Sequence, residues 1–117
     1  MDSILNSIRK KLGGELFVSP EEATPFDDEL IQDINSALMI LTQIGVGKMG
    51  YAITSAEDTW QDFLGDTNTD KELVKTYVGL KVKLMFDPPA SNVLVKLIED
   101  QTREYEWRLN VRAESNV

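Results

Sequence analysis

The sequence contains no cysteine and no histidine. Without cysteine, the chain has no disulfide framework, structural zinc site, iron–sulfur cluster or reactive thiol. Without histidine, it has no Ser-His-Asp triad, no imidazole acid or base and no facial-triad iron site. Long hydrophobic runs are also missing, because no stretch approaches the roughly 18 apolar residues of a membrane span, and the first residues lack the pattern of a secretory signal. We therefore expect a protein that works in the cytoplasm, or assembles from it, with no membrane partner.

What the chain does contain is enough apolar residues for one modest core, together with an excess of acid. Of its 117 residues 42% are hydrophobic, which suits a single domain of ordinary size. The formal net charge is -8. Residues 21–44 hold six acids and no Lys or Arg, whereas residues 71–86 hold four Lys and one Glu. We expect one acidic face and one mildly basic face, and the overall charge disfavours gripping a nucleic acid.

The spacing of apolar residues predicts a short helix followed by a long one. Apolar residues recur at helical spacing over residues 4–12, and two glycines follow as a stop. After a linker over residues 13–22, Thr24 is expected as the N-cap of the second helix, with Asp27 reaching back as the acid of a capping box. The apolar stripe then continues to Gly45, which suits the end of this helix.

Residues 45–66 predict a loop-rich insert, because four glycines interrupt the periodic pattern. Within the insert, residues 51–54 are expected to be extended. Residues 58–64 are expected to form one or two helical turns that carry Trp60, Phe63 and Leu64 inward.

A third helix is expected to begin at Thr69, in a capping box with Glu72, and to end before Pro88. The alternation of apolar residues with lysines over residues 80–84 is also compatible with a half-buried strand. The length of the segment and its cap favour the helix.

The fourth helix is expected to follow the double proline at 88 and 89, with Ser91 as its cap. Trp107 falls off its expected buried stripe, on a flank shared with Val93 and Val111. Residues 113–117 are polar and predict a disordered tail. The expected stripe consists of Leu94, Leu97, Ile98, Gln101, Tyr105 and Leu109.

These elements predict an all-α fold. We expect a small bundle of about four helices with the loop-rich insert between the second and third long elements. A single domain would span residues 1–112, and its first 22 residues would be the short helix and linker.

Two short motifs resemble ligand-binding loops but are better explained as turns. Residues 45–50 have the letters of a glycine-rich phosphate loop, yet they follow a helix and no βαβ unit surrounds them. Residues 66–70 begin like a calcium loop, but Lys71 replaces the required Gly and Tyr77 stands in place of the bidentate Glu. The clustered carboxylates lack both histidine and a basic phosphate cradle, so a solvated face explains them better. The sequence therefore predicts no enzyme, no metal and no cofactor.

Most aromatic residues are expected in the core, and Trp107 is the exception. A tryptophan off the buried stripe and beside Arg108 is typical of an interface anchor. Packing of the same flank on the N-terminal helix is an equally good interpretation, because a small bundle can bury a wide stripe.

Separated blocks of the sequence also carry a family resemblance. They read LTQIGVG at 41–47, YAI at 51–53, TWQDF at 59–63, KTYV at 75–78, LKVKLMFDPP at 80–89 and EWRLN at 106–110. In this order they resemble the head-tail connector family of tailed bacteriophages, also called adaptor or head-completion proteins. The FDPP turn and the EWRLN block are the most specific parts.

The resemblance implies a small helical protein that assembles as a ring, a dodecamer in this family, beneath the portal protein after DNA packaging. Such a ring joins the portal to a stopper or tail-completion protein and lines the exit channel, so that DNA is passing cargo. The implied location is the head-tail junction of the virion, preceded by the host cytoplasm, where a monomeric free subunit is compatible with the hypothesis. The matched blocks have no catalytic role in that family.

On this hypothesis two sets of residues are candidate surfaces. An acidic wall would let DNA pass without adhering, because like charge lowers the gain from counterion release. A cytoplasmic acidic helical module for protein–protein interaction is the alternative that the residues leave open. The candidates for the portal or subunit interface are Trp107, Arg108, Val111 and Arg112. The candidates for the acidic channel wall are Asp27, Asp28 and Asp33.

Overall fold

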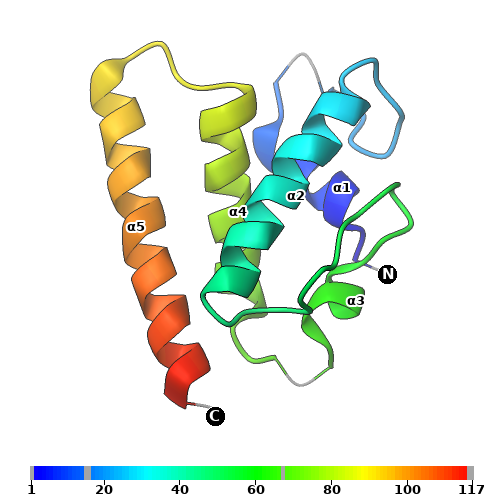
Figure 1. Cartoon of the computed structure of the whole chain (residues 1–117). Coiled ribbons are helices and arrows are strands. Elements are labelled where there is room, and N and C mark those ends of the chain that lie inside the picture. Colours follow the sequence, from blue (N-terminus) through cyan, green and yellow to red (C-terminus); the bar gives the residue numbers. More distant parts are fainter. Residues whose placement is uncertain (1, 15–16, 67, 116–117) are drawn as a thin grey trace.

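The computed structural model describes residues 2–14, 17–66 and 68–115, and within them the chain forms five helices and no strand (Figure 1). The predicted all-α class is confirmed. The loop-rich insert lies between the second and fourth helices and contains the short third one. None of the helices in these ranges is long and apolar enough to cross a membrane. The helices are α1 (Ile4–Leu12), α2 (Asp27–Gln43), α3 (Trp60–Leu64), α4 (Lys71–Phe86) and α5 (Asn92–Ser115).

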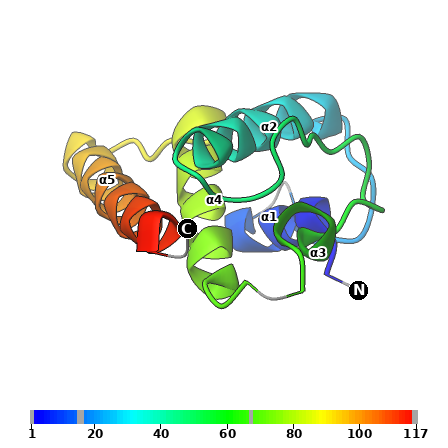
Figure 2. The same cartoon turned by 60° about the horizontal axis from the view of Figure 1, so that its bottom comes forward.

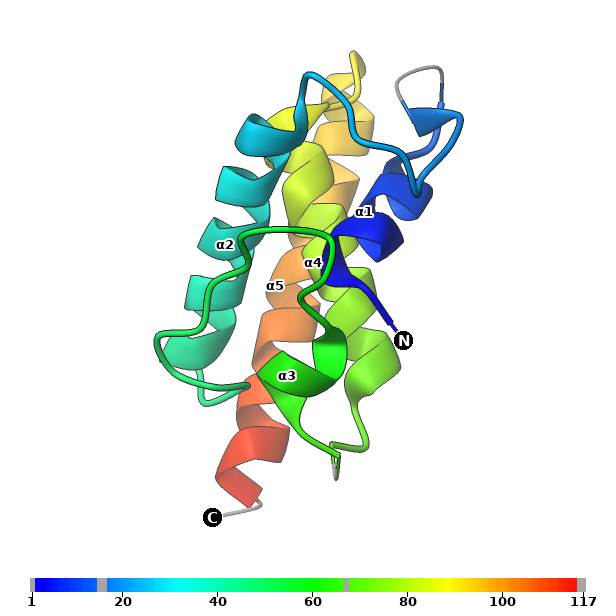
Figure 3. The same cartoon turned by 90° about the vertical axis from the view of Figure 1, so that its right-hand side faces the viewer.

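The central helix is α4, which contacts α1, α2 and α5. Figure 3 shows α2 and α1 on opposite sides of it. Because α4 is covered from several sides, its apolar residues are spread around the helix, and this spread produces the alternation over residues 80–84. The strand interpretation of that segment is wrong. The buried residues of α4 are Val74, Tyr77, Val78, Gly79 and Val82.

The start of the chain forms part of the core. Ile4 and Ile8 of α1 are fully buried, as is Trp60 of α3. The Trp60 indole donates a hydrogen bond of 3.0 Å to Ser7 Oγ. The backbone N–H of Ile4 donates to the carbonyl of Asp58 at 3.0 Å, so α1 and the insert support each other.

Both long middle helices begin later than the sequence suggests. Asp27 does reach back, because its carboxylate accepts hydrogen bonds from the Thr24 backbone N–H at 3.1 Å and from the Thr24 hydroxyl at 2.9 Å. The helical geometry nevertheless starts at Asp27. The expected capping box of Thr69 and Glu72 is wrong, since α4 has no side-chain cap and the Thr69 hydroxyl instead accepts a hydrogen bond from Arg112.

The glycine-rich turn after α2 packs onto α3. Gly47 has a φ of 84°, and a side chain there would overlap the ring of Phe63, so the position requires glycine. The next residue, Lys48, donates its N–H to the Phe63 carbonyl at 2.9 Å. Residues 51–54 form neither helix nor strand and are held against α2 by Asn35, whose amide exchanges two hydrogen bonds with the Ile53 backbone.

The last helix, α5, lies at one side of the bundle, with α4 between it and the main part of α1 (Figure 2). Its start is capped as expected, because the Leu94 N–H donates to Ser91 Oγ at 3.4 Å. Leu94 and Leu97 are 50% and 57% exposed, so their place on a buried stripe is wrong. The cause is that the first half of α5 is covered on one side only. Of the expected tail, residues 113–115 belong to α5, while 116 and 117 lie outside the described residues.

Candidate assembly surface

The side of α5 that points away from α4, here called the outer face of α5, carries large apolar side chains. Val93, Leu97, Trp107 and Val111 share this face at 100° per residue, and all four are exposed. Trp107 is 66% exposed, which confirms its predicted place off the buried stripe. Packing of this flank on the N-terminal helix is wrong, because α1 packs on α4 instead. Apolar side chains gathered on one exposed face are typical of an interaction surface.

The second half of α5 fixes the helix to the rest of the molecule. The fully buried Tyr77 of α4 donates a hydrogen bond of 2.6 Å to Glu106, and Lys81 lies 3.8 Å from the same carboxylate. The Asn110 amide donates to the carbonyl of Ile44, at the end of α2, at 3.1 Å. In the first half, the ion pairs stay within the helix, as between Lys96 and Asp100. The outer face is therefore held on a rigid support at its Trp107 end.

The four predicted interface residues lie together on the last turns of α5, but they differ in what they contact. Trp107 is open to solvent, and Arg108 forms an exposed ion pair of 3.4 Å with Glu104. Arg112 donates to Asp70 at 3.2 Å and to Thr69 at 3.1 Å, so it ties α5 to the start of α4. A partner could thus cover the exposed Trp107 directly, and at Arg108 it would meet an ion pair that lies within α5, whereas Arg112 already joins α5 to α4.

Asp27, predicted for an acidic wall, is an internal ion-pair partner. Its carboxylate lies 2.6 Å from the guanidinium of Arg9, which is 2% exposed. Arg9 also donates to Asn6 at 2.9 Å and to the carbonyl of Pro20 at 3.2 Å. Burial alone would raise the pKa of Asp27, but the hydrogen bonds from Arg9 and Thr24 outweigh it and lower that pKa. The ion pair joins α1 to the start of α2, and the hydrogen bond to Pro20 holds the linker against α1.

The other two acids predicted for the wall, Asp28 and Asp33, differ in how far they are exposed to solvent. Asp33 is partly buried, and burial together with the nearby Glu29 raises its pKa. One carboxylate oxygen of Asp33 is buried and has no hydrogen-bond partner among the described residues. Asp28 is exposed in the first turn of α2, as is Glu29. The three predicted acids therefore do not form one wall, and Asp28 is the member that presents its charge to solvent.

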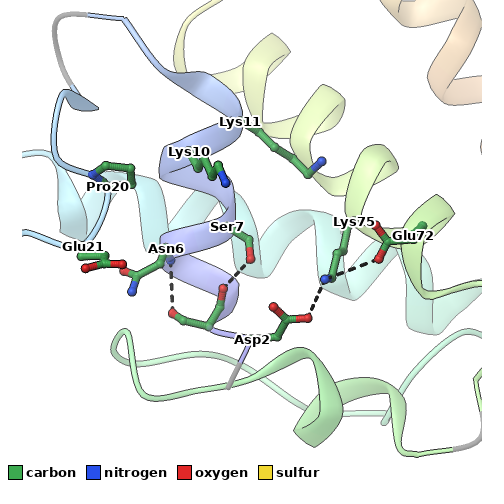
Figure 4. A pocket seen from close by; sticks show the side chains of 10 residues that line it. Asp2, Asn6, Ser7, Lys10, Lys11, Pro20, Glu21, Glu72 and Lys75 are labelled. Atoms are coloured by element: carbon green, nitrogen blue, oxygen red, sulfur yellow. Dashed lines mark hydrogen bonds and ion pairs between the residues drawn. The ribbon is translucent and has the colours of Figure 1, made fainter.

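Three lysines of α4 lie close to acids that are distant in the sequence: Lys71 and Lys75 to Asp2, and Lys81 to Glu106. Lys75 lies 2.6 Å from Asp2, in a cavity of about 700 Å³ beside α1 (Figure 4). Hydrogen bonds from Lys75 and then Lys71 lower the pKa of Asp2. Because acids and lysines in this cavity neutralise one another, it offers no single charge to a ligand. In the described ranges no cluster of acids has the geometry of a metal site.

The comparison with protein families decides what kind of protein carries this surface. The family model described as Phage connector protein matches residues 4–116. The chain belongs to the phage connector protein family. Its role is that of a structural connector and virion component, which interacts with other virion proteins. Searches among curated proteins and solved structures find no match.

Membership of this family favours the connector over the cytoplasmic interaction module, and a structural family suggests a role without catalysis. Two features of the connector were not predicted from its sequence. One is the burial of Arg9. Its signal in the sequence was a basic residue on the apolar face of α1, together with residues 21–44, which hold acids and no Lys or Arg. The other is the exposure of Leu94 and Leu97, which no pattern in the local sequence predicts.

Proposed function

We propose that this connector assembles as a ring beneath the portal, joins the portal to a stopper or tail-completion protein, and lines the channel through which DNA leaves the head. The match to the connector family over residues 4–116 carries the proposal. In the ring each subunit would contact its two neighbours through two different surfaces, since head-to-tail contacts form a ring when the rotation between successive subunits closes. The family resemblance implies a dodecamer, and a monomeric free subunit that joins the ring only on the portal is part of the proposal.

The Trp107 end of the outer face of α5 is the proposed contact with the portal. Trp107 is exposed beside Arg108, and tryptophan and arginine are the residue types most enriched among binding hot spots. The supporting helix is fixed beneath them by Tyr77 and Asn110. A rigid support favours binding, because less freedom is lost when the partner docks.

The exposed acids around Asp28 suit two places in such a ring. Facing the channel, they would repel the phosphate backbone and let DNA slide past. Facing a neighbouring subunit, they would need a basic surface opposite them.

Mixing the purified connector with the portal protein of the same phage and imaging the complex by electron microscopy tests the function. We expect a ring of added density on the tail side of the portal. A portal that shows no added density at saturating connector would contradict the proposal.

A substitution tests the proposed contact. Trp107→Ala should weaken portal binding by about tenfold or more, the effect of losing a hot-spot side chain. Leu97→Ala is the matched control, since Leu97 is exposed on the same face but lies about 15 Å from Trp107 along the helix. Equal binding by the wild-type protein and Trp107→Ala, measured by surface plasmon resonance, would rule this contact out.

A further inference from the structure

A groove lies between α1, α4 and α5, on the side of α4 away from α2. Its volume is about 340 Å³, and its lining combines the apolar Leu12, Leu80 and Ile98 with Lys11 and Lys83. Among the residues that the structure describes, no acid lines the groove. Lys83 also lies 3.3 Å from Asp87, but an exposed pair within one helix is weak and readily exchanged. The groove therefore suits a surface that is both apolar and acidic.

The exposed side of α2 has this character. Asp28, Gln32 and Met39 lie along one stripe at 100° per residue, and Glu29 flanks it. Met39 is 61% exposed, and the whole of residues 21–44 contains no Lys or Arg. Because α2 and α1 lie on opposite sides of α4 (Figure 3), one subunit can present this stripe and the groove in opposite directions.

We propose that the α2 stripe of one connector subunit docks in the groove of the next subunit. Met39 would cover the apolar floor, while Asp28 and Glu29 would approach Lys11 and Lys83. The inference rests on the proposed ring and names the two surfaces that join its subunits.

Charge complementarity selects a second copy of the chain as the occupant of the groove. A subunit with a net charge of -8 repels its copies unless an acidic surface meets a basic one. The stripe and the groove are different surfaces on opposite sides, which is the arrangement that a closed ring of identical subunits requires. On this arrangement Asp28 lies at a subunit boundary and not on the channel wall.

The absence of cysteine from the chain makes disulfide cross-linking a direct test. Met39→Cys is mixed with Thr76→Cys, because Thr76 lines the groove. Under mild oxidation we expect the mixed dimer to form at least about tenfold faster than in the control mixture of Met49→Cys with Thr76→Cys. Met49 is a suitable control, since it is 82% exposed but lies in the loop after α2. Equal rates in the two mixtures would overturn the proposal.

Reversal of charge tests the same contact independently. Lys11→Glu with Lys83→Glu in the groove chain, or Asp28→Lys with Glu29→Lys in the stripe chain, should each slow the Met39–Thr76 cross-link by about tenfold. Combining the two charge-reversed chains should restore the rate of the Met39–Thr76 cross-link.

The control is Lys96→Glu, on the outer face of α5, which should leave the cross-linking rate unchanged. Circular dichroism verifies folding, and Asp28→Asn with Glu29→Gln replaces the lysine variant if α2 loses stability. Failure of the reversed pair to recover would contradict the proposal.

The portal experiment separates this inference from the proposed function. A ring beneath the portal together with equal cross-linking rates would refute the docking of α2 in the groove and leave the connector function standing. Fast cross-linking without a ring would refute the portal-bound ring and leave a head-to-tail contact. Cross-linking of the groove cysteine to a cysteine-bearing portal, and not to a second connector, would show that the portal occupies the groove and that the inference is wrong.

Discussion

Tyr77 of α4 and Glu106 of α5 are joined by a hydrogen bond of 2.6 Å, in which a fully buried phenol donates to a carboxylate. Burial, followed by the hydrogen bond to Glu106, raises the pKa of Tyr77 far above its usual value. The phenol therefore stays protonated, and remains a donor, at neutral pH. This bond fixes the position of α5, and with it the proposed portal contact, on the central helix.

Tyr77→Phe removes this donor while keeping the ring in the core. The free energy of unfolding should fall by about 1.5–3 kcal/mol, the contribution of a hydrogen bond to a charged group. Tyr105→Phe is the control, because no hydrogen bond of its hydroxyl is found in the part of the chain that the structure describes, and its effect should be small. Urea denaturation measures both. A loss for Tyr77→Phe no larger than that for Tyr105→Phe would show that the bond does not stabilise α5.

The ion pair between Arg9 and Asp27 predicts a loss of stability in acid. Because the pKa of Asp27 is lowered by folding, the stabilisation is present above the unfolded pKa, near 4, and disappears as the pH falls through the folded value. Asp27→Asn leaves the buried Arg9 without its counter-charge and should cost about 3 kcal/mol at pH 7.

The difference between wild type and Asp27→Asn should shrink as the pH is lowered from 5 toward 2, as measured by thermal unfolding at each pH. Asp28→Asn is the matched control, since Asp28 is exposed one residue further along and should cost no more than about 1 kcal/mol. A difference between wild type and Asp27→Asn that is constant with pH would rule out the ion pair as its source.

Asp33 predicts the opposite dependence on pH. Burial and Glu29 raise its pKa, so ionised Asp33 opposes folding, and stability is lost as the pH rises through the unfolded pKa. Asp33→Asn should raise the melting temperature at pH 7 and leave it nearly unchanged at pH 3. A lower melting temperature for Asp33→Asn at pH 7 would contradict this interpretation.

Alanine substitutions at two glycines of the turn after α2 distinguish the cost of steric overlap from the cost of backbone strain. Gly47 and Gly50 both have positive φ, so alanine is strained at either position. A Cβ at Gly47 would also overlap Phe63, whereas no atom of the described part of the chain lies within 4 Å of a Cβ at Gly50. Gly47→Ala should therefore destabilise the protein by about 1–3 kcal/mol more than Gly50→Ala, as compared by urea denaturation. Equal losses would mean that Phe63 moves aside freely.

The sequence by itself determined the helices and excluded the sites that need cysteine or histidine. A helix leaves a local signature in the spacing of its apolar residues and in the glycines and prolines that stop it, so each predicted helix exists within a few residues of its expected place. The sequence also places Trp107 off the buried stripe, because the position of a residue around a helix depends only on its spacing from the other residues of the same helix.

Only the tertiary structure decided which faces are covered and which charges are free. Leu94 and Leu97 have the spacing of core residues but are exposed, since their burial requires a second element against α5. Asp27 was expected on a surface and instead pairs with Arg9, 18 residues away, while Lys75 pairs with Asp2, 73 residues away. Such pairs depend on how α1, α2 and α4 pack together, and the order of residues within one element does not contain that information.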